Sequence, residues 1–258
     1  MPEMKSRAVT YTALSGIPLI EPGDDLCTII ADALETAEII PQPADTLVIA
    51  QKIVSKAEGR YVDLAKVIPS ARALELAAAT HKDARLIEVI LSESTDVLRH
   101  HKDILIVAHR LGFVMANAGV DQSNIAPNGG DRVLLLPRDP DASCAALKAA
   151  FDRRFGVGVA VVINDSFGRA WRNGVVGVAL GAAGMPALHN LIGAPDLFGR
   201  PMRVTEVAIA DELAAAASLL MGQADEGTPV VHVRGLRWNA TPANAAALIR
   251  PKHMDLFR

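Results

Sequence analysis

The run from Val161 to Trp171, which reads VVINDSFGRAW, constrains the fold and the chemistry of this chain more than any other stretch. The apolar residues from Val157 to Ile163 predict a buried strand, which delivers Asn164, Asp165 and Ser166 to its C-terminal end. In open α/β sheets, that end of a strand is where ligands usually bind. The segment therefore predicts a buried strand with a polar, potentially functional end.

Two interpretations of this polar end fit the sequence. Gly168, Arg169 and Arg172 follow at once, and a carboxylate beside a hydroxyl and guanidinium groups suits a site for a metal ion and a phosphate. The simpler interpretation is a strand end closed by an aspartate turn. On this segment alone, both interpretations remain open.

The rest of the chain predicts a mixed architecture. Its 258 residues suffice for one large domain or two small ones, and only 4% are aromatic, so the core is expected to be aliphatic. Helices and strands alternate without a strict rhythm and without repeats, which predicts an α+β or mixed α/β fold. Strands are expected at 46–50, 103–107, 133–136, 157–163, 175–180, 205–210 and 229–233, and helices at 26–40, 71–83, 84–94, 142–156 and 211–221. A turn is expected at 127–131, and Asp139 and Asp141 are expected to shape a turn and cap the helix that follows, with Asp141 able to act as the cap.

Composition restricts the class of partner. The formal net charge is -3, with 21% charged residues, so nothing predicts a nucleic-acid-binding surface. The N-terminus lacks an apolar signal core, and the apolar runs fall short of the ~18 residues of a spanning helix. Cys27 and Cys144 have no metal-ligand spacing and are interpreted as buried free thiols. We expect a soluble, cytoplasmic protein without membrane or nucleic-acid partners.

Three polar clusters could carry chemistry, and none matches a Walker, Rossmann, GxSxG or HExxH motif. They are Asp121 with Ser123 and Asn124, Asp165 with Ser166, and Gln51 with Lys52, Lys56 and Glu58. Mg²⁺ commonly takes one or two carboxylates plus substrate phosphates, and lysines supply point charges for phosphate oxygens. Taken together, the clusters favour phosphoryl transfer or nucleotide binding. The alternative is that they are solvated loops.

An ordered series of segments connects the clusters. The series is GIPLI (16–20), QKIVSKAEGR (51–60), GVDQSN (119–124), LLPRDPDAS (135–143), INDSFGRAWRNG (163–174) and ADELAAAASLLMGQ (210–223). It resembles the coenzyme F420-0:L-glutamate ligase family, the γ-glutamyl ligases of deazaflavin biosynthesis, over roughly residues 14 to 238. The segments occur in the family's order with similar spacing. No flavin domain follows, so the chain resembles the stand-alone form of the family.

The resemblance implies an activity, a set of cofactors and an assembly. It implies a GTP-dependent ligase that adds L-glutamate to the deazaflavin precursor coenzyme F420-0 through an acyl phosphate, using Mn²⁺ or Mg²⁺ and K⁺. It also implies a two-lobed α+β fold that forms an intimate homodimer. Residues 1–258 would form one ligase unit of two intertwined lobes, and the sequence does not place the boundary between them.

The resemblance further implies roles for particular residues. Asp121 and Asp165 would hold one metal ion, and Ser166 a second. Nucleotide contacts would come from Ile17, Pro18, Leu19, Ile20, Gln51, Lys52, Lys56, Asn124, Met221, Gly222, Gln223 and Glu226. The catalytic residues would be Lys52, Lys56, Arg169 and Arg172, which could stabilise charge on the transferred phosphoryl group. Arg169 and Arg172 could instead bind a carboxylate of glutamate or of the precursor.

Two other functions remain open from the sequence. A paralogue could join an amino acid to a different phosphorylated acid, or the chain could be a non-catalytic nucleotide-binding protein. The number of glutamates added, and whether the acid is of the lactyl or the glyceryl type, are not determined. Trp171 and Trp238 are interpreted as packing residues.

Overall fold

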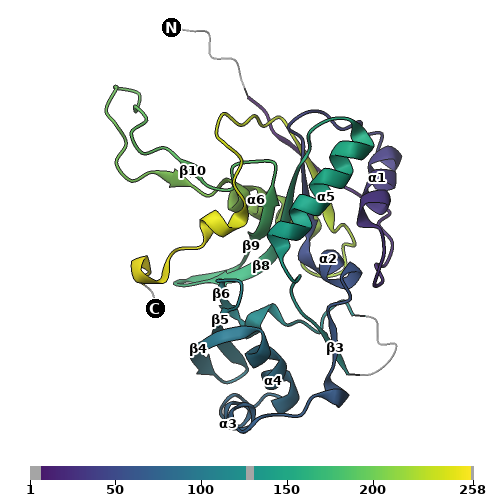
Figure 1. Cartoon of the computed structure of the whole chain (residues 1–258), viewed down its shortest axis with the longest axis vertical. Coiled ribbons are helices and arrows are strands. Elements are labelled where there is room, and N and C mark those ends of the chain that lie inside the picture. The colour runs from purple at the N-terminus through teal and green to yellow at the C-terminus, as the bar shows by residue number, and fades with distance from the viewer. Residues whose placement is uncertain (1–6, 126–130, 257–258) are drawn as a thin grey trace.

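The computed structural model describes residues 7–125 and 131–256, which form two lobes of unequal size (Figure 1). The smaller lobe, at the bottom of Figure 1, consists of residues 61–125 and 131–134 and has its own buried clusters. The larger lobe contains the remaining described residues and the main sheet. The predicted turn at 127–131 lies outside the described residues, except for Asp131.

The main sheet has five strands in the order β1–β12–β2–β8–β9. Its strands are β1 (Thr10–Ala13), β12 (Val230–Arg234), β2 (Thr46–Ala50), β8 (Ala160–Arg169) and β9 (Arg172–Ala183). Only β2 and β8 pair in parallel, and the other neighbours are antiparallel. The α+β class predicted from the sequence is confirmed.

Helices cover both faces of this sheet. Side chains alternate along β8: Val161 and Ile163 join the core on the side of α1 (Leu26–Thr36) and α5 (Pro140–Phe155), while Val162 joins the core on the side of α6 (Ile209–Met221). Burial on both faces explains why the strand reads as an unbroken apolar run.

Local signals set the helix ends. Asp139 caps α5 by accepting the amide of Ala142, and Gly156 ends the helix in the left-handed conformation. Of the two aspartates expected to shape a turn and cap this helix, Asp139 is therefore the cap, and the prediction that Asp141 could cap it was wrong. Asp141 lies in the first turn and accepts backbone N–H groups from outside its own helix. Helix α1 ends at Thr36, before the predicted end at residue 40.

The smaller lobe contains a three-stranded and a two-stranded sheet. The first comprises β4 (Ser94–His101), β5 (Ile104–His109) and β6 (Val114–Ala116), and the second β3 (Tyr61–Asp63) and β7 (Arg132–Leu134). Helices α3 (Ala71–Thr80) and α4 (Ala84–Ser92) pack on this lobe, with short 3₁₀ turns at Leu64–Lys66 and Asn117–Gly119. Strand β4 was not predicted, because its polar and charged side chains lack an apolar face.

Strand β8 differs from its prediction in a way that matters for the site. It does not end at Ile163 but continues through Asn164, Asp165 and Ser166 to Arg169, where it turns into β9. Strand β9 is likewise longer than predicted. Since successive side chains on a strand point to opposite faces, Asp165 and Ser166 lie on opposite sides of β8.

The C-terminal third adds an arm and a closing segment. The arm contains β10 (His189–Asn190) and β11 (Glu206–Val207) and projects at the upper left of Figure 1. The predicted strand at 205–210 is short because Ile209 already begins α6. Short 3₁₀ turns at Ala245–Leu248 and Lys252–Met254 follow β12. None of the helices described is long and apolar enough to cross a membrane.

Gly177 allows β9 to approach α6 closely. A Cβ atom at this position would lie 2.2 Å from Ser218 Oγ and 2.3 Å from the carbonyl oxygen of Ala214. We expect Gly177→Ala to lower the free energy of unfolding by about 2 kcal/mol, because the helix backbone must move away. Urea denaturation would measure this. Gly158→Ala is the control, since a Cβ there meets nothing within 4 Å; equal stability of both variants would contradict the prediction.

Candidate active site

A cavity of about 680 Å³ lies between the two lobes. It is lined by segments from five parts of the chain, namely residues 17–21, 50–56, 115–125, 164–168 and 218–229, together with Tyr61. All residues predicted to bind metal or nucleotide line this cavity: Ile17, Pro18, Leu19, Ile20, Gln51, Lys52, Lys56, Asp121, Asn124, Asp165, Ser166, Met221, Gly222, Gln223 and Glu226. The fold thus brings together residues that are more than 200 positions apart.

The parallel pair of strands explains how two of these segments meet. Ala50, the last residue of β2, pairs with Asn164 of β8. Helix α2 (Gln51–Ala57) begins immediately after β2, so its first residues lie beside the polar part of β8. Helix α2 was not predicted from the sequence, because only seven residues separate strand β2 from the turn that follows.

An ion pair joins the lobes across the cavity. The Lys52 ammonium lies 2.7 Å from an Asp121 carboxylate oxygen and donates to Ser123 Oγ at 2.7 Å. Asp121 also accepts the backbone N–H of Ser123. Burial opposes ionisation of Asp121, but the hydrogen bonds from Lys52 and Ser123 outweigh it and hold its pKa below the usual value. Asp121 is therefore ionised at neutral pH.

The pKa of Asp165 is shifted in the opposite direction. Its pKa is raised to about 6, mainly because the carboxylate is buried, and the negative charge of Asp121 acts in the same direction. The hydrogen bond from the Ser166 N–H and the charge of Lys52 oppose this shift but do not outweigh it. Lys52 thus forms an ion pair with Asp121, and its charge also acts on Asp165. A divalent cation would relieve the repulsion between Asp121 and Asp165, and two carboxylates completed by phosphate oxygens form a donor set that Mg²⁺ accepts. No group of three or more His, Cys, Asp or Glu side chains suited to a metal occurs among the described residues. Water molecules or phosphate oxygens would complete the coordination in such a site.

Asn164 is a candidate site residue that the sequence reasoning missed. Its side chain is buried, and its Nδ2 donates to Ser218 Oγ at 3.0 Å. The Ser218 hydroxyl donates in turn to the Ala214 carbonyl, which fixes the orientation of the amide. Asn164 Oδ1 has no hydrogen-bond partner among the described residues, and Asn164 lines the cavity. Such an orphaned oxygen fits a cation or a ligand N–H group.

A loop after α6 closes the far side of the cavity. Lys56 Nζ donates to the Asn124 carbonyl at 2.8 Å, and Asn124 Nδ2 donates to the Ala224 carbonyl at 3.2 Å. Gly222 begins the loop with φ of 71°, and a Cβ there would lie 1.9 Å from the carboxyl carbon of Glu226. Only glycine fits this position. Burial and the nearby Lys52 lower the pKa of Lys56.

Comparison with known proteins shows the family of this chain. Residues 16–235 match the model of the F420-0:gamma-glutamyl ligase family. The chain belongs to this family. It is 42% identical over 252 residues to the coenzyme F420:L-glutamate ligase of Methanothermobacter thermautotrophicus, covering 97% of this chain and 99% of the relative. It is 46% identical over 243 residues to the protein of the same name from Methanopyrus kandleri, covering 93% of each chain.

In this member of the F420-0:gamma-glutamyl ligase family, two of the predicted catalytic residues lie just beyond the cavity lining. Arg169 and Arg172 flank the tip of the β8–β9 hairpin and are not among the residues that line the cavity. Trp171, between them, is 88% exposed. Its interpretation as a packing residue was wrong, whereas Trp238 packs against the core on the α6 side. The sequence could not separate these positions from Asp165, because all of them follow one another in a single segment.

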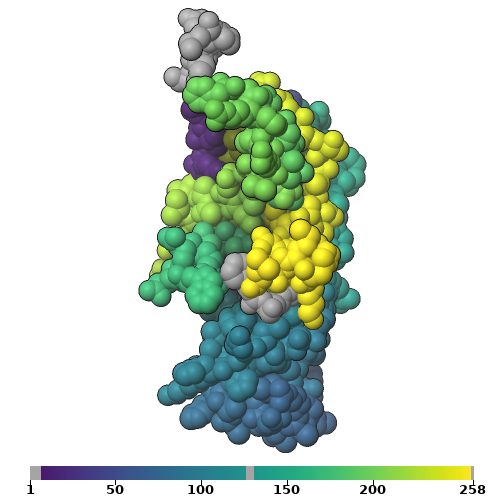
Figure 2. Space-filling view, turned by 90° about the vertical axis from the view of Figure 1, so that its left-hand side faces the viewer, coloured from purple at the N-terminus to yellow at the C-terminus, as the bar shows by residue number. Residues whose placement is uncertain are grey.

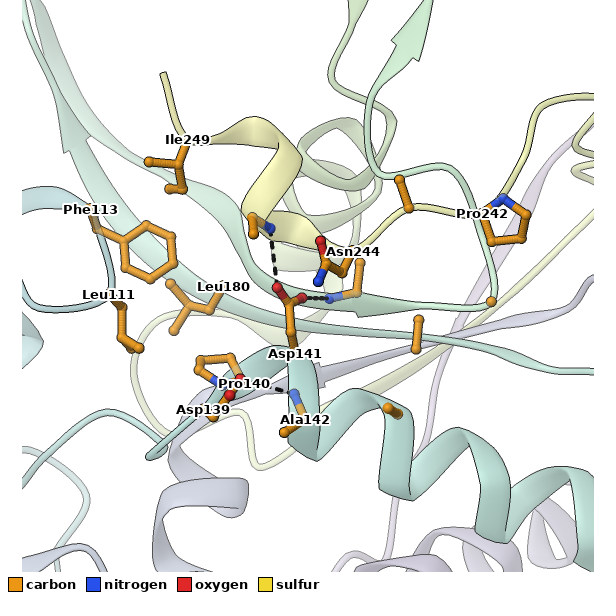
Figure 3. A pocket seen from close by; sticks show the side chains of 16 residues that line it. Leu111, Phe113, Asp139, Pro140, Asp141, Ala142, Leu180, Pro242, Asn244 and Ile249 are labelled. Atoms are coloured by element: carbon orange, nitrogen blue, oxygen red, sulfur yellow. Dashed lines mark hydrogen bonds between the residues drawn. The ribbon is translucent and has the colours of Figure 1, made fainter. Parts of the chain in front are cut away.

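A second cavity, of about 670 Å³, is less suited to chemistry (Figure 3). It lies between the start of α5, β9 and the C-terminal segment, and Leu111, Phe113 and Leu180 line it. The Asp141 side chain points at the C-terminal segment, and its oxygens accept the N–H groups of Ala182, Ala245 and Ala246. This carboxylate anchors the C-terminal segment to the sheet.

Proposed function

We propose that this chain is a GTP-dependent ligase that joins L-glutamate to the deazaflavin precursor coenzyme F420-0. The names of its relatives support the ligase activity and the substrate pair. The observation that carries the proposal is the grouping of Lys52, Asp121 and Asp165 in the cavity between the lobes. Two carboxylates that would hold a divalent cation, with a lysine beside them, suit the phosphates of a nucleotide.

The reaction requires activation, because an oxide ion is a very poor leaving group from a carboxylate. A carboxylate oxygen of the precursor attacks the γ-phosphorus of GTP, the bond to GDP breaks, and an acyl phosphate forms. The α-amine of glutamate then attacks the carbonyl carbon, inorganic phosphate leaves with the C–O electron pair, and the amine loses a proton. Positioning and charge neutralisation dominate such transfers.

We assign different residues of the cavity to different roles in this reaction. Lys52 and Lys56 reach into the cavity and neutralise charge that develops on the transferred phosphoryl group. Asp121 and Asp165 would hold one Mn²⁺ or Mg²⁺, with Ser166 on a second across the strand. Bound there, such ions would neutralise phosphate charge and orient the oxygens. Asn164 Oδ1 provides one further oxygen for K⁺ or for a donor group of the nucleotide.

The nucleotide is proposed to contact Ile17–Ile20, Gln51, Lys52, Lys56 and Asn124. The loop from Met221 to Glu226, including Gly222 and Gln223, is proposed to cover it from the α6 side. We also propose that two copies of the chain form a homodimer. The projecting arm supports this, because Leu197 and Phe198 are almost fully exposed there.

The direct test is incubation of the protein with F420-0, L-glutamate, GTP and Mn²⁺, followed by mass spectrometry of the deazaflavin. We expect a mass increase of one glutamyl residue or more, which is lost when GTP is omitted or when EDTA is added. Ligation of glutamate to other phosphorylated acids but not to F420-0 would favour a paralogous amino-acid ligase. Nucleotide binding without turnover on any acid would favour a non-catalytic protein.

A further inference from the structure

The tip of the β8–β9 hairpin carries a tryptophan that the fold does not use. Trp171 is 88% exposed, and its ring makes none of the aromatic contacts found among the described residues. Its φ of 64° is left-handed, a conformation that is costly for a bulky residue and is usually taken by glycine or asparagine. An exposed and strained aromatic residue in a chain with 4% aromatics indicates binding rather than folding.

The tip is continuous with the cavity. Asn164 to Gly168 line the cavity, and the same strand runs on to Arg169, which pairs with Arg172 across the hairpin. At about 3.3 Å per residue, Arg169 lies roughly 13 Å along the strand from Asp165. Figure 2 shows the teal-green tip standing out from the surface, between the blue smaller lobe and the green arm. A ligand that extends out of the cavity along β8 would therefore reach Trp171.

The charge at the tip is not neutralised within the fold. Neither Arg169 nor Arg172 has a carboxylate within ion-pair distance in the described parts of the chain. The contact found for Arg169 is a long one, from Nη2 to the Asn173 carbonyl at 3.4 Å. Two guanidinium groups without a carboxylate partner, beside an exposed indole, suit a ligand that combines a planar ring with a phosphate.

We propose that Trp171 stacks on the tricyclic ring of the deazaflavin precursor and that Arg169 and Arg172 bind its phosphodiester. The carboxylate end of the precursor then reaches the phosphoryl group near Asp165. This inference rests on the proposed function and assigns a part of the substrate to each part of the hairpin. Trp171 becomes the residue that selects an acid with an aromatic ring, and the two arginines bind substrate outside the chemical centre.

Kinetics with three substrates test the assignment. We expect Trp171→Ala to raise the KM for F420-0 about tenfold, the scale of one aromatic stacking contact, while the KM for GTP stays within about twofold. Trp171→Phe should recover most of the loss. With a phosphorylated hydroxy acid that lacks the ring, wild type and Trp171→Ala should have equal kcat/KM. Trp238→Phe is the control and should match the wild type throughout.

Fluorescence gives a readout that does not depend on turnover. The chain has two tryptophans, and the deazaflavin should quench the emission of the one that it stacks on. We expect titration with F420-0 to quench Trp238→Phe as strongly as wild type and to leave Trp171→Phe almost unquenched. The Trp171 variants should also unfold at the same urea concentration as wild type, or at a higher one, because the fold gains nothing from this side chain.

Three results would overturn the proposal. They are an unchanged KM for F420-0 in Trp171→Ala, equal quenching of both single-tryptophan variants, and a change of molecular mass in solution caused by Trp171→Ala. The last would assign the tip to a contact between copies of the chain. If the wild type binds F420-0 without ligating it, the proposed function fails, and the quenching experiment still decides the role of Trp171.

Discussion

Replacing Asp165 by asparagine is expected to lower ligation by on the order of a thousandfold, the scale for loss of a preorganised charge at a reacting phosphate. Asp165 lines the cavity together with Lys52 and Asp121, and the charges of both act on its carboxylate. The amide keeps the size of the side chain but loses the charge that would hold a divalent cation. The mass increase of the deazaflavin measures turnover, and electron paramagnetic resonance of free Mn²⁺ in the presence of GTP measures ion binding.

The same variant should remain folded. Burial and Asp121 disfavour the charged form of Asp165 in the native protein, so a neutral amide is expected to leave the melting temperature unchanged or to raise it. Asp103→Asn is the matched control. Asp103 is exposed, has a φ of 67° that asparagine also adopts, and lies in the smaller lobe away from the cavity. Turnover of Asp165→Asn near that of Asp103→Asn would refute the metal role of Asp165.

Replacing Glu93 by glutamine is expected to lower the free energy of unfolding by about 3 kcal/mol, because it leaves partly buried arginines without a counter-charge. One oxygen of Glu93 lies 3.1 Å from Arg60 Nη2 and 3.0 Å from Arg110 Nε. Arg60 and Arg110 also donate to the carbonyl groups of Leu136 and Arg138. This cluster ties the smaller lobe to the segment that leads back into α5.

Urea denaturation measures the loss, and Glu75→Gln is the control. Glu75 pairs with Arg72 on the surface, where an ion pair contributes about 0.5 kcal/mol or less. Equal destabilisation by both variants would show that the buried cluster does not hold the lobes together.

The pH dependence of stability gives a second measurement on Glu93. Burial opposes its ionisation, but the nearby His109, Arg60 and Arg110 outweigh it and lower the pKa to about 2, from an ordinary value of 4.5. Because the native pKa is the lower one, Glu93 stabilises the fold fully above pH 4.5, and this contribution is lost as the pH falls toward 2. The difference in stability between wild type and Glu93→Gln should therefore shrink over this interval.

Local patterns in the sequence were sufficient for the elements whose signals are strong. The apolar runs of β2 and β8 and the alanine-rich α6 were predicted correctly in kind, because burial on both faces and helical spacing leave clear patterns. Strand β4 was missed because its residues are only partly buried or exposed and do not form an apolar face. Its assignment depends on pairing with β5, which is a tertiary contact.

For the candidate site, too, some features followed from the sequence and others only from the tertiary structure. The sequence by itself determined the family, and it predicted which polar residues gather at the candidate site, since their chemistry and order follow directly from the chain. Only the tertiary structure decided that β8 continues past Ile163. This places Asp165 and Ser166 on opposite faces and carries Arg169, Trp171 and Arg172 out of the cavity. The physical reason is that β9 pairs with the polar half of β8, and backbone hydrogen bonds extend a strand whatever its side chains are.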